Sequence, residues 1–114
     1  MKQALQTYID AFNAADTATI SSLYADDAVV EDPVGKPPMT GRTAIEEFYT
    51  KAIASGAKLT LDGPIRGSHG DRAAMAFTID VPGMRIRAID VMTFNDEGKI
   101  THMQAHWGPD DIEA

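Results

Sequence analysis

The order of patterns along this chain predicts an α+β fold, with three N-terminal helices packed on one face of a mostly antiparallel sheet. Two observations predict it. Apolar residues recur at helical spacing through the first half, whereas strand-length segments separated by turn residues follow from Lys58 onward. Helices followed by an antiparallel meander are typical of an α+β layer. The chain has 114 residues, which fits one domain covering residues 1–114.

The first two helices are expected before residue 25. Residues 1–15 place four side chains on one apolar stripe at helical spacing: Leu5, Tyr8, Ile9 and Phe12. Asp16 is of a type that caps helix N-termini, so a second, short helix is predicted after it. The apolar stripe of that second helix consists of Ile20, Leu23 and Tyr24.

A short strand and a loop are expected to lead into the third helix. The strand is predicted at Ala28–Val30, and residues 33–41 form a loop because they contain three prolines and two glycines. Thr43 and Glu46 have the spacing of a capping box. The helix that follows carries Tyr49 on its apolar stripe and ends at residues 55–56, a Ser-Gly pair.

The second half is predicted to form four strands. Pro82-Gly83 and the four residues 95–98 are typical hairpin turns, and Gly63-Pro64 suggests a kink inside the first strand. The helices would cover one face of this sheet and leave the other to water or a partner. The predicted strands are Lys58–His69, Ala73–Val81, Met84–Phe94 and Lys99–Trp107.

Composition narrows the classes of function. The chain has no cysteine, which removes disulfides, thiol nucleophiles and thiolate metal sites. Its net charge of −7 disfavours binding to nucleic acid and to anionic membranes. No apolar run reaches the roughly 20 residues of a membrane span, and no secretory signal is evident. These features are compatible with a cytoplasmic protein.

The chain lacks the usual cofactor and metal signatures. Neither a phosphate-binding loop nor a dinucleotide-binding motif is present. His102 and His106 share one face of a predicted strand, but four strand residues separate them by roughly 13 Å, too far for one metal ion. We therefore expect a function without a metal or a redox cofactor.

Asp90 is the first candidate for chemistry. Side chains alternate between the faces of a strand, and Asp90 shares its face with the more apolar set of the Met84–Phe94 segment. Desolvation among apolar neighbours disfavours the charged form, and a neutral carboxyl can donate a hydrogen bond. The pattern alone leaves open that Asp90 lies beside a bulge or faces solvent.

Asp32 is the second candidate. Pro33 favours an extended backbone at Asp32, which sends Glu31 and Asp32 to opposite sides. Asp32 shares its side with Val30, which favours an inward position. A carboxylate before a proline is more often a turn residue than a base, so its local pattern alone predicts a structural role.

Three tyrosines lie on the predicted apolar stripes, one on each helix. These are Tyr8, Tyr24 and Tyr49. A buried phenol must satisfy its hydroxyl, usually by a structural hydrogen bond. If all three face inward, they can meet as a hydrogen-bonded network.

Several motifs in order make the chain resemble the bacterial ketosteroid isomerases, which have a nuclear-transport-factor-2-like fold. The resemblance spans nearly the whole chain. It is most specific at Glu31-Asp32-Pro33 and Ile89-Asp90-Val91. It continues in Gly41-Arg42 with Ile45 and Phe48-Tyr49, in Met92 and Phe94, and in Met103-Gln104-Ala105 with Trp107.

The resemblance implies a fold and a partner. The fold is a conical barrel, in which a curved sheet wraps around the helices and encloses an apolar pocket. Members of this family are typically homodimers joined through their sheets. Two departures, a short hairpin at Pro82-Gly83 and a chain end soon after Trp107, bear on substrate range and dimer strength more than on chemistry.

The resemblance also implies roles for named residues. Asp32 matches the general base, whereas Tyr8 and a protonated Asp90 match the donors of the oxyanion hole. Tyr24 and Tyr49 match the network that supports the catalytic tyrosine. The expected substrate-binding residues are Phe77, Met103 and Trp107.

The implied activity is steroid delta-isomerisation, which converts 3-oxo-Δ5-steroids to 3-oxo-Δ4-steroids by proton transfer through a dienolate, without a cofactor.

The alternatives are a non-catalytic module for an apolar ligand and another enzyme of the same fold. An epoxide hydrolase would need an arginine between two aspartates, but Arg85 and Arg87 lie on the strand face opposite Asp90. A polyketide cyclase often adds a pocket histidine, but His102 and His106 face away from Met103 and Trp107 in the predicted alternation.

Overall fold

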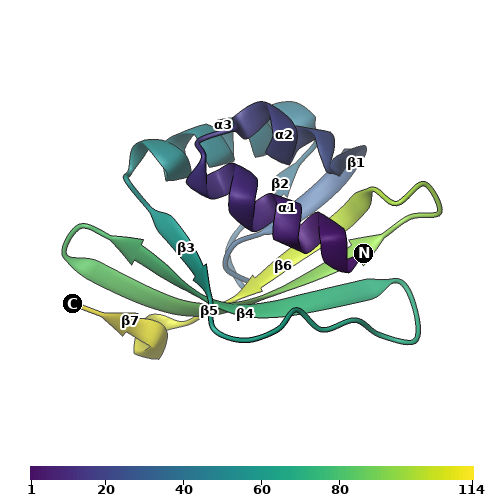
Figure 1. Cartoon of the computed structure of the whole chain (residues 1–114). Coiled ribbons are helices and arrows are strands. Elements are labelled where there is room, and N and C mark those ends of the chain that lie inside the picture. Colours follow the sequence, from purple (N-terminus) through teal and green to yellow (C-terminus); the bar gives the residue numbers. More distant parts are fainter.

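The computed structural model describes all of residues 1–114 and confirms the predicted α+β architecture (Figure 1). Three helices lie on one side of a seven-stranded sheet. In chain order the elements are α1 (Lys2–Asn13), α2 (Thr17–Ser22), β1 (Tyr24–Glu31), β2 (Met39–Thr40), α3 (Arg42–Ala54), β3 (Lys58–Leu61), β4 (Arg72–Val81), β5 (Met84–Phe94), β6 (Ile100–His106), the 3₁₀ turn η1 (Pro109–Asp111) and β7 (Ile112–Glu113). None of the helices is long and apolar enough to cross a membrane.

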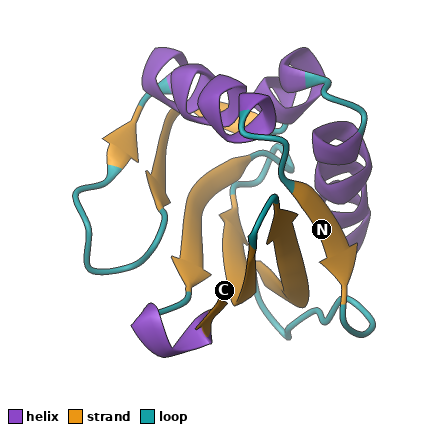
Figure 2. Cartoon of the chain, turned by 90° about the vertical axis from the view of Figure 1, so that its left-hand side faces the viewer, coloured by secondary structure: helices purple, strands orange, loops and turns teal.

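The strands follow the order β2-β1-β6-β5-β4-β3, and all pair antiparallel except β1 with β6. The hairpin of β4 and β5 is the longest pairing and sets Met75 opposite Asp90. Strand β7 pairs with the part of β5 that β6 does not reach, and Ile112 lies opposite Ile86. Figure 2 shows the strands curving beneath the helices. The curvature encloses the core between the two layers.

The hydrophobic core fills the space between the helices and the concave side of the sheet. It consists of 22 buried residues, which come from α1, α2, α3 and the strands. Alternation along β5 supplies part of it, because Ala88, Met92 and Phe94 are buried while Ile89 is 49% exposed. One sheet face therefore packs on the helices and the other is open.

Three local predictions are corrected, and the loop predicted over residues 33–41 contains the short strand β2. Tyr24 begins β1 instead of closing the second helix, because α2 ends at Ser22 with Leu23 as its C-cap. The strand predicted over 58–69 ends at Leu61, and the remainder is a loop that touches β4 through an isolated bridge between Arg66 and Ala74. The capping box predicted at Thr43 is wrong, because α3 begins after Gly41 without a side-chain cap. The terminal η1 and β7 were not predicted.

Other predicted boundaries hold. Asp16 caps α2 by accepting a hydrogen bond from the Thr19 backbone N–H, at 3.1 Å. Strand β5 spans the predicted Met84–Phe94. The third helix ends at Ala54, one residue before the expected Ser-Gly pair, and Gly56 adopts a left-handed φ of 85°.

Candidate active site

A cavity of about 150 Å³ lies between the helices and the concave side of the sheet. Of its 12 lining residues, 10 are hydrophobic, and the remaining two are Asp32 and Ser55. The hydrophobic ones are Tyr8, Phe12, Phe48, Tyr49, Ala52, Ala57, Leu59, Phe77, Ile79 and Val81. An apolar cavity with few polar groups is typical of a small-molecule site.

Asp90 lies on the concave face of β5, and its residue is only 1% exposed. Neither carboxylate oxygen has a hydrogen-bond partner within the protein. Burial, together with the negative charge of Asp32, raises the pKa of Asp90 well above its ordinary value. Both effects favour the neutral form of the Asp90 carboxyl, which can donate a hydrogen bond.

Asp32 follows the last residue of β1 and lines the cavity. The indole Nε1 of Trp107 donates a hydrogen bond to its Oδ1 at 2.8 Å. Burial raises the pKa of Asp32 above its ordinary value, and the Trp107 hydrogen bond opposes that rise because it stabilises the carboxylate. Asp32 thus ionises before Asp90, which has no such donor.

The three tyrosines form a cluster beside these acids, although they come from α1, β1 and α3. The Tyr24 and Tyr49 hydroxyls are 2.6 Å apart and hydrogen-bonded. The Tyr8 ring meets the Tyr49 ring edge-on, with centroids 5.6 Å apart. Burial raises the pKa of all three phenols well above the ordinary value, so each keeps its proton. Tyr8 lines the cavity and can donate into it.

The three expected substrate-binding residues occupy different places. Phe77 lines the cavity. Trp107 is not part of the lining and contacts the site through its bond to Asp32. Met103 is wholly buried in the core, paired with Met92 of the neighbouring strand, and does not line the cavity. Its expected role in substrate binding therefore stays a prediction.

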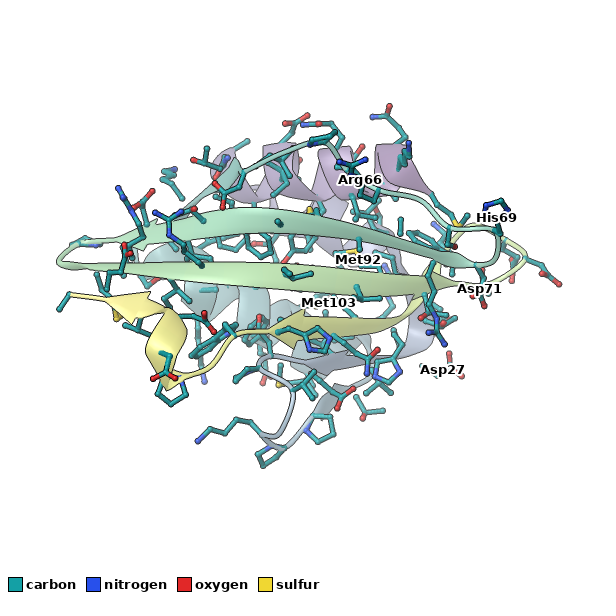
Figure 3. All side chains as sticks on the ribbon, turned by 90° about the horizontal axis from the view of Figure 1, so that it is seen from below. Asp27, Arg66, His69, Asp71, Met92 and Met103 are labelled. Atoms are coloured by element: carbon teal, nitrogen blue, oxygen red, sulfur yellow. The ribbon has the colours of Figure 1, made fainter.

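The arginines and histidines of the sheet lie away from the cavity. Arg85 bonds Asp80 at 2.8 Å, and Arg87 bonds Thr78 at 3.4 Å. His102 contacts Glu31 at 2.6 Å on the sheet face away from the helices, the face seen in Figure 3. The chain has no cluster of three His, Cys, Asp or Glu side chains suited to a metal ion. Because Arg85 and Arg87 bond Asp80 and Thr78, neither arginine lies between Asp32 and Asp90.

Several lining residues were not identified from the sequence as part of a site. Ile79 and Val81 lie on the same strand face as Phe77, so the alternation of side chains along β4 could have identified them as lining residues. Phe48 and Ala52 share the helical spacing of Tyr49 in α3, so the apolar stripe of that helix was an available signal. Ser55 gave no signal, because its place at the cavity depends on how α3 meets β3 and β4.

The chain matches a known family over most of its length. Residues 5–103 match the SnoaL-like domain. A Steroid Delta-isomerase of Nocardioides simplex is 40% identical over 116 residues, covering 98% of this chain and 93% of that protein. Epoxide hydrolase LasB of Streptomyces lasalocidi is 26% identical, covering 96% of this chain and 42% of that protein.

A solved structure has the same fold. It is that of SalBIII, an epoxide hydrolase/cyclase-like enzyme described as having a role in pyran ring formation in the polyether salinomycin. Its TM-score is 0.91 at 30% identity, covering 99% of this chain and 94% of that one. The fold thus occurs with more than one chemistry, so the residues of the site must decide between them.

Proposed function

The chain belongs to the SnoaL-like domain family, and from that premise we propose that it is a steroid delta-isomerase, which converts 3-oxo-Δ5-steroids to 3-oxo-Δ4-steroids. The observation that carries the proposal is the contrast between two acids beside the tyrosine cluster. Asp32 lines the cavity and accepts a hydrogen bond from Trp107, whereas Asp90 is buried, has no hydrogen-bond partner and has a pKa raised well above its ordinary value. The 40% identity with an isomerase over nearly the whole chain supports it.

The first step is proton removal. Ionised Asp32 takes the acidic proton from the carbon between the ketone and the isolated double bond. The electron pair of that C–H bond moves toward the carbonyl, and the ketone oxygen becomes the oxyanion of a dienolate. A base whose pKa is raised toward the working pH is suited to this transfer.

The second group of residues stabilises the oxyanion. Tyr8 and neutral Asp90 donate hydrogen bonds to it, in a cavity that is almost entirely apolar. Preorganised donors in such surroundings stabilise developing charge strongly. The dienolate then takes the proton back from Asp32 two carbons farther along, and its oxygen returns to a ketone conjugated with the new double bond. No atom is gained or lost.

Tyr24 and Tyr49 support this arrangement from behind. Their mutual hydrogen bond and the edge-on contact of Tyr49 with Tyr8 hold the Tyr8 ring in place. Phe77 supplies apolar contact for the substrate. Trp107 acts through Asp32, so it is a positioning residue.

The substrate is a small molecule, and we further propose a homodimer formed through the exposed sheet face. Ile89 lies on that face with 49% of its surface exposed, next to Ala76 of β4. Burial of such apolar surface favours association. The expected cytoplasmic location and the lack of nucleic-acid and membrane binding stay predictions.

The direct test follows the growth of conjugated-enone absorbance from a 5-ene-3-ketosteroid. The chain should catalyse it, and Asp32→Asn should lose most of the turnover while still binding steroid. Asp27→Asn is the matched control, because Asp27 is an exposed carboxylate of β1 and should leave the rate unchanged. Near-normal turnover by Asp32→Asn would show that another group is the base.

The same assay separates the alternatives. Steroid binding without enone formation would favour a non-catalytic module for apolar ligands. Hydrolysis or cyclisation of an epoxide, with no enone formed, would favour the chemistry named for LasB and SalBIII. The positions of Arg85 and Arg87, which bond Asp80 and Thr78, argue against an arginine acting with Asp32 and Asp90.

A further inference from the structure

The residues that line the cavity differ in exposure along its length. From Tyr49 in α3 to the C-cap Ser55, six residue steps rise by roughly 9 Å. Along β4, the four residue steps from Phe77 to Val81 span roughly 13 Å. Tyr49 and Phe77 are buried, Val81 is half-buried and Ser55 is exposed. The cavity therefore extends from buried residues such as Tyr8 and Tyr49 to a mouth at Ser55, the only exposed residue of the lining.

Besides Asp32 and the hydroxyls of Tyr8 and Tyr49, Ser55 carries the only polar side chain of the lining. Its hydroxyl donates a hydrogen bond to the backbone carbonyl of Ala52, at 2.5 Å. A serine hydroxyl has one proton and two acceptor lone pairs. With its proton used inside α3, the Ser55 oxygen is left as a hydrogen-bond acceptor at the mouth.

The size of the cavity brings the far part of a ligand to this residue. A volume of about 150 Å³ is below the roughly 300–1,000 Å³ of pockets that enclose a whole drug-sized ligand. A fused-ring ketone with its carbonyl at Tyr8 and Asp90 then has its opposite ring at the mouth. Substituents on that ring meet Ser55.

We propose that Ser55 is a specificity-determining residue that accepts a hydrogen bond from a hydroxyl on the far ring of the substrate, and so favours hydroxyketosteroids over diketosteroids. A ketone at the same position has no proton to offer, and it could bond Ser55 only if the bond to Ala52 were broken. This inference rests on the proposed isomerase function, since it takes the carbonyl to be at the acids.

The test compares two substrates that differ only on the far ring, 17β-hydroxyandrost-5-en-3-one and androst-5-ene-3,17-dione. The measured quantity is the ratio of their kcat/KM values, hydroxyl over ketone. Ser55→Ala should lower this ratio by a factor of about three to ten, the range for one hydrogen bond. Ser55→Thr keeps a hydroxyl and should retain the ratio.

Thr50→Ala is the matched control. Thr50 lies on the same helix, and its hydroxyl also bonds a helix carbonyl, that of Glu46 at 2.8 Å, but it does not line the cavity. Its removal should leave the ratio unchanged. A general loss of helix stability would lower both kcat/KM values together and leave their ratio constant.

The outcomes separate this proposal from the proposed function. If both steroids are isomerised and Ser55→Ala leaves the ratio unchanged, Ser55 does not set specificity while the isomerase assignment holds. If neither steroid is isomerised, the proposed function fails. In that case the dissociation constants of the same two steroids test Ser55. If the ratio of these two constants is the same in Ser55→Ala as in the unchanged chain, Ser55 does not act as the acceptor.

Discussion

At the scale of single residues, the site depends on two aspartates whose surroundings differ in burial and in one hydrogen bond. Asp32 receives the Trp107 N–H, whereas both oxygens of Asp90 lack a partner. A donor stabilises the charged form of an acid, and burial without a donor stabilises the neutral form. The same residue type can therefore serve as a base at one position and as a hydrogen-bond donor at the other.

Replacing Trp107 by Phe is predicted to move the pH dependence of catalysis. The Trp107 hydrogen bond lowers the pKa of Asp32 against the effect of burial, so its loss raises that pKa. The rising limb of kcat/KM against pH, which reports the ionisation of the base in the free enzyme, should shift to higher pH. The control His106→Phe alters an exposed residue of β6 and should leave the limb in place. An unmoved limb in the Trp107 variant would contradict the role of this bond.

Removal of the Asp90 donor is predicted to slow the chemical step. Asp90→Leu should lower kcat by about 10²–10³, the effect of one lost oxyanion donor. Asp90→Asn keeps a neutral N–H donor and should lose less. Single-turnover measurements of enone formation check both variants. Equal rates for Asp90→Leu and the unchanged chain would remove Asp90 from the oxyanion hole.

Asp90 also links stability to pH. Its pKa is raised in the folded state, so folding takes up a proton wherever the unfolded carboxyl is ionised. This group's contribution is complete below the ordinary pKa of 3.8 and falls by up to about 1.4 kcal/mol per pH unit as pH rises toward the folded pKa. Urea unfolding should therefore show Asp90→Asn gaining stability relative to the unchanged chain as pH rises. A difference that is constant with pH would show that Asp90 is ionised in the fold.

At the scale of elements, Asn13 joins α1 to β3 through its backbone carbonyl, which accepts a hydrogen bond from Lys58 Nζ at 3.1 Å, and through its side chain. The Asn13 amide donates to the Leu59 carbonyl and accepts from the Leu59 N–H, each at 2.8 Å. Leu59 lies on an edge strand, where these backbone groups face away from β4 and would otherwise lack a partner in the sheet. Asn13 thus acts as a one-residue extension of the sheet, and it fixes the helix that carries Tyr8 against the wall that contains Leu59.

Asn13→Ala is predicted to destabilise the fold by roughly 1–3 kcal/mol, because two partly buried backbone groups lose their partner. Gln6→Ala is the control, since Gln6 bonds only Asp10 on the surface of α1 and its loss should stay within about 0.5 kcal/mol. Denaturant unfolding measures both. A change in Asn13→Ala no larger than that in the control would show that water satisfies Leu59 equally well.

At the scale of the whole molecule, the helices cover only one face of the sheet (Figure 1). The other face combines Ile89 and the short side chains of Ala74 and Ala76 with polar groups such as His102. Small residues around an exposed isoleucine leave room for another surface to approach closely. This face is the one that we propose for the dimer.

A charge placed on that face is predicted to separate the copies. Ile89→Glu should convert a dimer to a monomer, because a buried unpaired carboxylate is costly. Thr50→Glu adds the same charge to the helical layer and should leave the mass unchanged. Light scattering coupled to size exclusion gives the mass of each. A dimer that persists in Ile89→Glu would place the contact elsewhere.

Local patterns were sufficient for the helices and the long strands, and insufficient for the short strands and for the junctions between elements. The stripe of α1, the Asp16 cap and the bounds of β5 follow from interactions within a few residues. Tyr24 was misplaced because helical spacing continues one turn past the true end of α2. The strand expected to reach residue 69 stopped at Leu61 because continued pairing with β4 depends on that partner and not on the segment itself.

By itself the sequence determined the order of the three helices and the long strands and placed Asp90 in register with an apolar row, because helical spacing and strand alternation are local. The ordered resemblance across the chain suggested roles for Asp32, Tyr8 and Asp90. Only the tertiary structure decided that Asp90 is buried, that Trp107 bonds Asp32, that Met103 does not line the cavity and that Ser55 stands at its mouth. Those facts depend on how α3, β4 and β6 approach one another, and such distances between segments far apart in the chain are set by packing.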